Sequence, residues 1–240
     1  MEEEFIQHHI SQQFNKELVE LRNQVLSMGG LVEEQLKNAI IALSTHNYQL
    51  ARQVYSDDYK VNALEVRIDE ESTRILAIRQ PTARDLRLVM AVIKTIPDLE
   101  RIGDQAESIA QMALQIQGEA ESKYFVAIRH LGEHVQYMLH NALDAFARID
   151  VEMALRVMDE DRKVDQECDS ISRQLITYMI AEPRTIPIVL NILWSARALE
   201  RVAAHSRNIC EYLIYFVKGK DVRHISSVEQ VEEEGRKSGD

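Results

Sequence analysis

Apolar residues recur along most of the chain at steps of three and four positions, the spacing of a helix with one buried face. The pattern is longest in two segments that end at Ile116 and at Phe216. The apolar positions of the first segment are Val89, Val92, Ile96, Leu99, Ile102, Ala106, Ile109, Ala113 and Ile116. Those of the second are Val189, Ile192, Ala196, Leu199, Val202, Ile209, Leu213 and Phe216. Each segment is therefore predicted to form one long amphipathic helix.

Four further segments show the same spacing, so the pattern predicts six helices in all. Their approximate spans are residues 15–43, 48–78, 124–148 and 151–180. Pro81 and Pro183 follow two of these segments and end them, because proline lacks the backbone donor that a helix interior needs. Glycine and proline are otherwise scarce, with 8 and 4 residues in 240. The composition favours an all-α fold.

The second half of the chain repeats the first. Lys60-Val61-Asn62 aligns with Lys163-Val164-Asp165 at a separation of 103 positions. Leu99-Glu100-Arg101 returns as Leu199-Glu200-Arg201 at a separation of 100. Long helices joined by short connections pack as antiparallel bundles. We therefore expect two tandem, internally repeated antiparallel three-helix bundles.

The expected domain boundaries follow from this repeat and from local composition. The first repeat is expected over residues 13–117 and the second over residues 124–225. A polar N-terminal arm at 1–12 precedes them, and a linker at 118–123 joins them. The polar and charged residues at 226–240 are predicted to form a disordered tail.

Charge and composition restrict the function. The net charge of −11 argues against a nucleic-acid binder, which needs a basic face. The chain lacks a basic and then apolar N-terminal signal, and no apolar run approaches the roughly 20 residues of a membrane span. Cys168 and Cys210 are isolated and are expected to be buried, reduced thiols. A cytoplasmic protein that binds protein partners or cations is expected.

Acidic pairs at helical spacing are the candidate site. Glu100 and Asp104 lie one turn apart beside the apolar face of the third predicted helix, and Asp58 and Asn62 have the same spacing on the second. Like charges at this spacing repel each other by a few tenths of a kcal/mol. If the two helices are neighbours, the four side chains converge as an oxygen-only site for a hard cation or for iron.

The corresponding site of the second repeat is altered. Asp161 and Asp165 are expected to face Glu200, but the position that matches Asp104 holds Ala204. His205 points roughly 100° away on the helix and does not replace the carboxylate. In addition, Glu107 of the first repeat corresponds to Arg207 of the second. The sequence therefore predicts one competent acidic site and one degraded site.

Three functions remain open on the residues alone: a binding protein with a metal site, a carboxylate-bridged metalloenzyme that uses Glu100, Asp104 and Asp58, or a scaffold whose acidic bands are only solvated. The chain contains no Glu-x-x-His, no Walker-type loop, no G-x-G-x-x-G, no G-x-S-x-G and no H-E-x-x-H. The sequence therefore gives little support to an enzymatic function, and a non-enzymatic function is expected. Outside the acidic pairs, Arg148 is a candidate partner contact, whereas Phe146 is expected in the core.

Several motifs together resemble the PhoU family over about residues 8–224. They are Met28-Gly29-Gly30, Arg79-Gln-Pro-Thr-Ala-Arg-Asp-Leu-Arg-Leu-Val-Met90, Leu99-Glu-Arg-Ile-Gly-Asp104, Leu143-Asp-Ala-Phe-Ala-Arg148, Lys163-Val-Asp-Gln166, Asn208-Ile-Cys-Glu211 and Lys218-Gly219. The resemblance implies tandem three-helix bundles whose acidic motifs hold iron or zinc clusters in some members, so iron, zinc or another divalent cation is the expected cofactor. The family motif carries onto Glu100 and Asp104, Asp58 and Asn62, Asp161 and Asp165, and Glu200. Ala203, Ala204 and Pro97 depart from it.

The resemblance also implies a function. It predicts a negative regulator of the phosphate regulon and of phosphate uptake, which acts as an adaptor between the phosphate ABC transporter and a sensor histidine kinase. The implied partners are a PhoR-type kinase and a PstB-type transporter ATPase, with a homodimer as the expected state. Contact with the membrane is expected only through these partners.

Overall fold

A computed structural model describes residues 2–116 and 123–220, with side chains described for residues 12–116 and 124–220. This part of the chain contains helices and no β-strand, so the all-α prediction is confirmed. The helices are α1 (Glu2–Thr45), α2 (Tyr48–Asp57), α3 (Tyr59–Arg79), α4 (Ala83–Gln115), α5 (Lys123–Arg148), α6 (Val151–Ala181), the short 3₁₀ helix η1 (Pro183–Thr185) and α7 (Ile186–Lys218).

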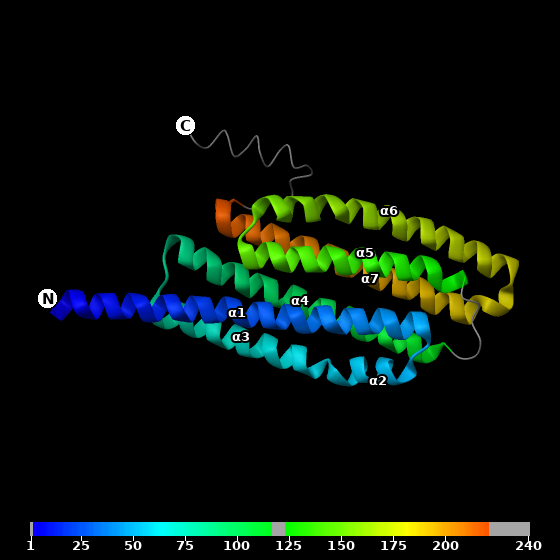
Figure 1. Cartoon of the computed structure of the whole chain (residues 1–240), viewed down its shortest axis with the longest axis horizontal. Helices are drawn as coiled ribbons and strands as arrows, with labels where there is room; N and C mark the ends of the chain where they lie inside the picture. Colours follow the sequence, from blue (N-terminus) through cyan, green and yellow to red (C-terminus); the bar gives the residue numbers. More distant parts are fainter. Residues whose placement is uncertain (1, 117–122, 221–240) are drawn as a thin grey trace, which may run out of the picture.

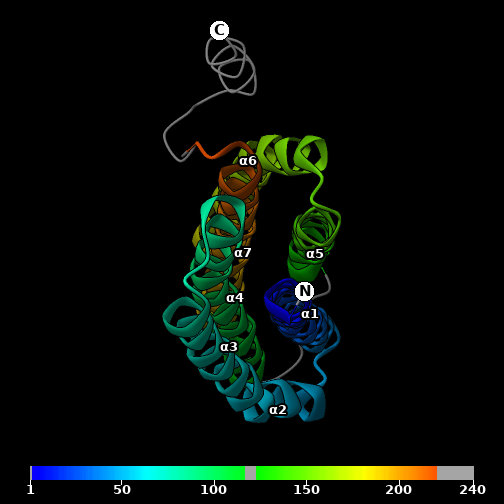
Figure 2. The same ribbon diagram turned by 90° about the vertical axis from the view of Figure 1, so that its left-hand side faces the viewer.

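The helices run back and forth along the long axis of the molecule (Figure 1). Helices α1 to α4 form the first unit, in which α2 and α3 take the place of one helix, and α5 to α7 form the second. The view along the axis shows α4 beside α7 and α1 beside α5 (Figure 2). Each of these pairs joins a helix to its counterpart in the other repeat, so the tandem repeat is confirmed.

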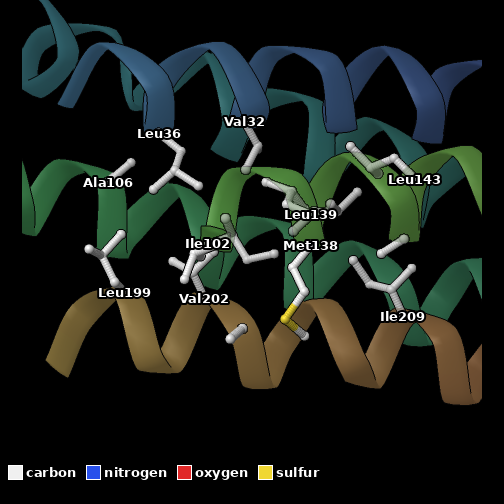
Figure 3. Close-up of a cluster of buried hydrophobic side chains, with 14 of the residues drawn as sticks. Val32, Leu36, Ile102, Ala106, Met138, Leu139, Leu143, Leu199, Val202 and Ile209 are labelled. Carbon is white, nitrogen blue, oxygen red and sulfur yellow. The ribbon is translucent and has the colours of Figure 1, made fainter. Parts of the chain in front are cut away.

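One hydrophobic core extends through both repeats. Helices α1, α4, α5 and α7 all contribute side chains to it (Figure 3). The residues labelled there are Val32, Leu36, Ile102, Ala106, Met138, Leu139, Leu143, Leu199, Val202 and Ile209. All of them are at most 8% exposed. The two three-helix bundles therefore share one continuous interior.

Two glycines allow α1 and α5 to approach each other closely. A Cβ atom built at Gly29 would lie 2.5 Å from Leu143 Cδ2, and one built at Gly132 would lie 2.8 Å from Ile40 Cγ2. Gly132 is the counterpart of Gly29, and Leu143 is the counterpart of Ile40, both at the separation of 103. The contact is therefore reciprocal, as across a two-fold axis.

The start of the chain differs from its predicted form. The backbone from Glu2 onward is the beginning of α1, whereas a polar arm was expected up to residue 12. Glutamate and glutamine favour helix without needing a buried face, which apolar spacing does not detect. The predicted linker at 118–123 lies outside the described residues except for Lys123, the first residue of α5. The predicted tail at 226–240 lies wholly outside them.

The helix predicted over residues 48–78 is interrupted, so that prediction is wrong at one point. Helix α2 ends at Asp57 and α3 begins at Tyr59. Asp58 keeps helical angles (φ −57°, ψ −37°). Its carbonyl, however, accepts a 2.9 Å hydrogen bond from the Val61 amide, whereas the bond from the Asn62 amide is longer, at 3.4 Å. This tighter three-residue step breaks the α-helical ladder. The break places Asp58 at the start of α3.

Candidate metal centre

Three carboxylates meet where α3 begins beside α4. Asp58, Asp104 and Glu107 each offer one oxygen, and the three oxygens lie within 4.8 Å of one another. Asp104 and Glu107 are three positions apart on α4, so their side chains share one side of that helix. Asp58 reaches them from the break between α2 and α3 because α3 packs against α4.

The same place is lined by buried polar atoms without partners. Asp58 Oδ1 is buried and accepts no hydrogen bond, and the same holds for Gln35 Oε1 on α1. Both atoms border Gly103, whose Cβ position lies 3.5 Å from Asp58 Oδ1 and 3.6 Å from Gln35 Oε1. Unpartnered buried oxygens cost roughly 1–3 kcal/mol each. A bound cation would satisfy them, so the residues present fit a metal.

Burial, and then repulsion between neighbouring charges, raises the pKa values of several carboxyl groups in and beside this cluster. Burial raises the pKa of Asp58, Glu65, Glu100 and Glu107 above their ordinary values. The charge of Asp104 adds to this rise in all four. Asp104 therefore stands at the centre of a negative field that a cation would neutralise.

The predicted ligands of the first repeat fall into two groups. Asp58 and Asp104 come together, whereas Asn62 donates its amide to Asp58 Oδ2 at 3.0 Å and Glu100 lies outside the group of three. The third member, Glu107, lies on the predicted acidic band but was not among the expected ligands. Gln35 was missed as well, although a glutamine within the apolar stripe of α1 is a signal for it.

In the second repeat an arginine occupies the corresponding place. Arg207 Nη1 lies 3.3 Å from Asp161 Oδ2, and its Nη2 lies 2.9 Å from Glu211 Oε1. Glu200 is paired with Arg197 at 2.8 Å. Among the described residues, the carboxylates of this repeat form no group of three comparable to the first. The guanidinium of Arg207 supplies the positive charge that the first site lacks.

The remaining predicted residues of this site are also placed. Burial, and then the charges of Asp161 and Glu200, raise the pKa of Asp165. His205 faces away from them, and its Nδ1 lies 2.6 Å from Asp98 Oδ1.

The second repeat also carries a cysteine where the first has Glu65. This residue, Cys168, lies 103 positions after Glu65, and its Sγ is 3.6 Å from Glu200 Oε2. Burial, assisted by the charge of Glu200, raises its pKa to about 12. Cys168 and Cys210 are free and buried, as predicted. Cys168 therefore stays a neutral thiol and does not replace the lost carboxylate.

The predicted partner contact lies at the exposed end of α5. The side chain of Arg148 is 70% exposed and donates to Asp144 Oδ1 at 2.8 Å. Phe146 is buried, as predicted. Arg148 is therefore presented to solvent, and its partner role stays a prediction.

Fold and site define an all-helical tandem-repeat protein with one intact carboxylate cluster and one that is closed by an arginine. The family model described as "PhoU domain" matches residues 25–113 and 128–213, one match to each repeat. The chain belongs to the PhoU family.

Relatives match nearly the whole chain. The phosphate-specific transport system accessory protein PhoU of Serratia marcescens is 54% identical over 90% of this chain and 89% of its own length. The protein of the same name from Escherichia coli K12 is 51% identical over 92% of each. The crystal structure of PhoU from Pseudomonas aeruginosa is similar with a TM-score of 0.84 at 48% identity, covering 86% of this chain and all of its own. That of the phosphate transport system regulatory protein PhoU from Streptococcus pneumoniae has a TM-score of 0.81 at 31% identity, covering 87% of this chain and 99% of its own.

Within the described residues, none of the helices has a stretch that is both long and apolar enough to span a membrane.

Proposed function

We propose that this chain is a negative regulator of the phosphate regulon and of phosphate uptake. The observation that carries the proposal is membership of the PhoU family over both repeats. It is supported by relatives that are named accessory proteins of the phosphate-specific transport system. These names describe accessory proteins, which favours a non-enzymatic role.

In this proposal the chain is a cytoplasmic adaptor between the phosphate ABC transporter and a sensor histidine kinase. It contacts a PstB-type ATPase and a PhoR-type kinase and works as a homodimer. An adaptor of this kind must bind one partner differently when the other is bound. Arg148, exposed at the end of α5, is the residue we assign to a partner surface.

The acidic cluster is assigned to a structural cation. Asp58, Asp104 and Glu107 would hold it, and the unpartnered Gln35 Oε1 borders Gly103 as Asp58 Oδ1 does. An all-oxygen set of this kind suits a hard divalent cation or iron better than it suits zinc. When bound, the cation would supply positive charge that fastens the start of α3 to α4. The carboxylates themselves orient the two helices and keep the site polar.

The test is alkaline phosphatase activity in phosphate-replete cells that lack this gene. We expect high activity in the deletion strain and low activity after complementation with the wild-type gene. Asp58→Asn/Asp104→Asn is expected to leave activity high, because it removes the cation site. Glu20→Gln/Glu70→Gln removes the same charge from two exposed positions and is the matched control, with low activity expected.

The outcomes separate the two parts of the proposal. Low activity in the deletion strain would contradict a negative regulator. Full repression by Asp58→Asn/Asp104→Asn would leave the regulator in place and remove the acidic cluster from its function.

A further inference from the structure

At one end of the molecule, two arginines at the start of α4 lie against the last turns of α7 (Figure 1). Arg84 Cζ is 5.6 Å from the centroid of the Phe216 ring, which is a cation–π contact. Arg87 Nε donates to the Phe216 carbonyl at 3.1 Å. One residue of α7 therefore holds both guanidinium groups, one by its ring and one by its backbone.

A third cation continues this arrangement along the same side of α4. Lys94 follows Arg87 by about two helical turns, so the two side chains point the same way. Lys94 Nζ lies 4.8 Å from the centroid of the Tyr215 ring and 5.8 Å from that of Tyr212. The three cations and the three α7 rings that they contact form what we call the basic surface.

The fold holds these cations in place without neutralising them. Within the part of the chain whose side chains are described, no carboxylate is paired with Arg84, Arg87 or Lys94. Asp85 lies between the arginines in sequence but roughly 100° or more around the helix from either. A guanidinium has five N–H donors and an ammonium has three, so most of these donors have no partner in the fold. Arg84 is exposed, while Arg87 and Lys94 are half-buried.

The arginines of the preceding helix show what this acidic chain does elsewhere. Arg74 is paired with Glu71 and Arg79 with Glu17, each at 2.6 Å. With a net charge of −11, carboxylates are plentiful in the chain. Three neighbouring cations without a carboxylate therefore set the basic surface apart.

The second repeat provides an internal comparison. At the separation of 100 positions, Lys94 corresponds to Trp194, and Arg87 corresponds to Pro187. Among the three cations only Arg84 has a basic counterpart. The matching end of the α4–α7 pair thus carries a tryptophan, 50% exposed, in place of the lysine. The basic surface belongs to one end of this helix pair and is not a requirement of its packing.

We propose that the basic surface docks an acidic segment of a partner protein, whose carboxylates accept hydrogen bonds from Arg84, Arg87 and Lys94. Arginine binds carboxylates through paired N–H donors, and such charge-assisted bonds are strong. Because rings and a carbonyl already hold the three side chains, binding costs less conformational entropy. Arginine and aromatic residues are also the types enriched in interfaces. The negative charge of the rest of the chain would direct an acidic segment to this place.

The surface also joins the two repeats, since α4 belongs to the first and α7 to the second. An acidic segment bound there would contact both at once. In the adaptor proposed above, the basic surface would receive one of the two partners, and this assignment rests on the proposed function. The docking chemistry itself is argued from the contacts alone.

The experiment is a titration of the full chain into a fluorescein-labelled oligoglutamate peptide, followed by fluorescence anisotropy, with backbone amide shifts recorded in parallel. We expect saturable binding and shifts confined to the start of α4 and the last turns of α7. Arg84→Gln/Arg87→Gln should weaken binding at least about 10-fold, because two guanidinium–carboxylate contacts are lost. Arg84→Lys/Arg87→Lys should lie between this variant and the wild type, since lysine keeps the charge but lacks the paired donors.

The matched control removes the same charge elsewhere. Arg52→Gln/Arg173→Gln changes two exposed arginines, on α2 and α6, and should bind the peptide like the wild type. Lys94→Gln, which leaves both arginines in place, should also weaken binding and keeps the test valid if the loss of Arg87 loosens the end of α7. Thermal melts check the fold of each variant.

Equal weakening by the control pair would overturn the proposal, because only the overall charge would then matter. An absence of peptide binding at low salt would overturn it as well. So would equally tight binding of single-stranded DNA of the same charge, which would make the surface a general polyanion site. The alkaline phosphatase assay does not depend on this titration, so failure of the surface and failure of the proposed regulator are distinguishable.

Discussion

At the residue scale, one exchange separates the two acidic sites. Glu107 adds a third negative charge to the cluster of Asp58 and Asp104, whereas its counterpart Arg207 pairs with Asp161. The carboxylates of the first site therefore repel one another unless a cation is bound, whereas the second site contains its own positive charge, Arg207. The two repeats have kept the same helix packing with opposite local electrostatics.

Asp104→Asn is expected to stabilise the metal-free protein by about 1 kcal/mol, because it removes the charge that repels four neighbouring carboxyls. Thermal or urea unfolding in chelator measures the change. The pKa values of those carboxyls are raised in the folded state, so the repulsion is fully present above the raised values and is lost as pH falls through them. The stabilising effect of the substitution should therefore be largest near neutral pH and should shrink on acidification.

With added divalent cation the wild type should become more stable than Asp104→Asn, because the wild type gains binding energy that the variant has lost. Lower stability of Asp104→Asn in chelator would contradict a repulsive cluster.

At the element scale, the crossing of α1 and α5 depends on the absence of two side chains. Gly132→Ala is expected to destabilise the fold by roughly 1–2 kcal/mol, since the new Cβ meets Ile40 Cγ2 on a stiff, β-branched side chain. Gly29→Ala should cost less, because the ends of Leu143 can move. Urea unfolding measures both effects, and we expect the m-value, the slope of the unfolding free energy against urea concentration, to be unchanged.

Gly30→Ala is the control for the intrinsic gain of alanine in a helix. No atom lies within 4 Å of its Cβ position, so we expect a stabilisation of about 0.5–1 kcal/mol. A gain of similar size for Gly132→Ala would show that the close approach is not tight.

The helices were predictable from the sequence because each carries a long apolar stripe. The sequence offsets between the repeats also identified correctly which helix of one repeat corresponds to which helix of the other. The break at Asp58 was not predictable. Val54 and Val61 lie on the same apolar stripe whether the backbone hydrogen bonds of the helix continue without a break or tighten for one step. Asp58 and Asp104 were placed together by assuming that their helices are neighbours. Whether Glu107 and Gln35 face the cluster depends on how each helix is rotated about its axis. Residue spacing along one chain does not determine that rotation.

At the scale of the whole molecule, the shared core links the stability of the two repeats. Helix α4 packs on α7 and α1 on α5, so separating the repeats exposes apolar faces on both. We expect fragments 1–116 and 123–220 to be aggregated or self-associated when produced singly, and to form a stable 1:1 complex when produced together. Light scattering and thermal melts of the three samples measure this. Monomeric fragments that melt like the intact chain would contradict a shared core.

The reciprocal contact of Gly29 with Leu143 and Gly132 with Ile40 also bears on the origin of the molecule. A contact in which each half offers the equivalent position to the other is the signature of a symmetric homodimer. The chain is thus arranged like a symmetric dimer of two three-helix units within one polypeptide. Symmetry of the backbone does not extend to the chemistry: one unit carries a carboxylate cluster, and the other has an arginine there and a histidine pair on its outer face.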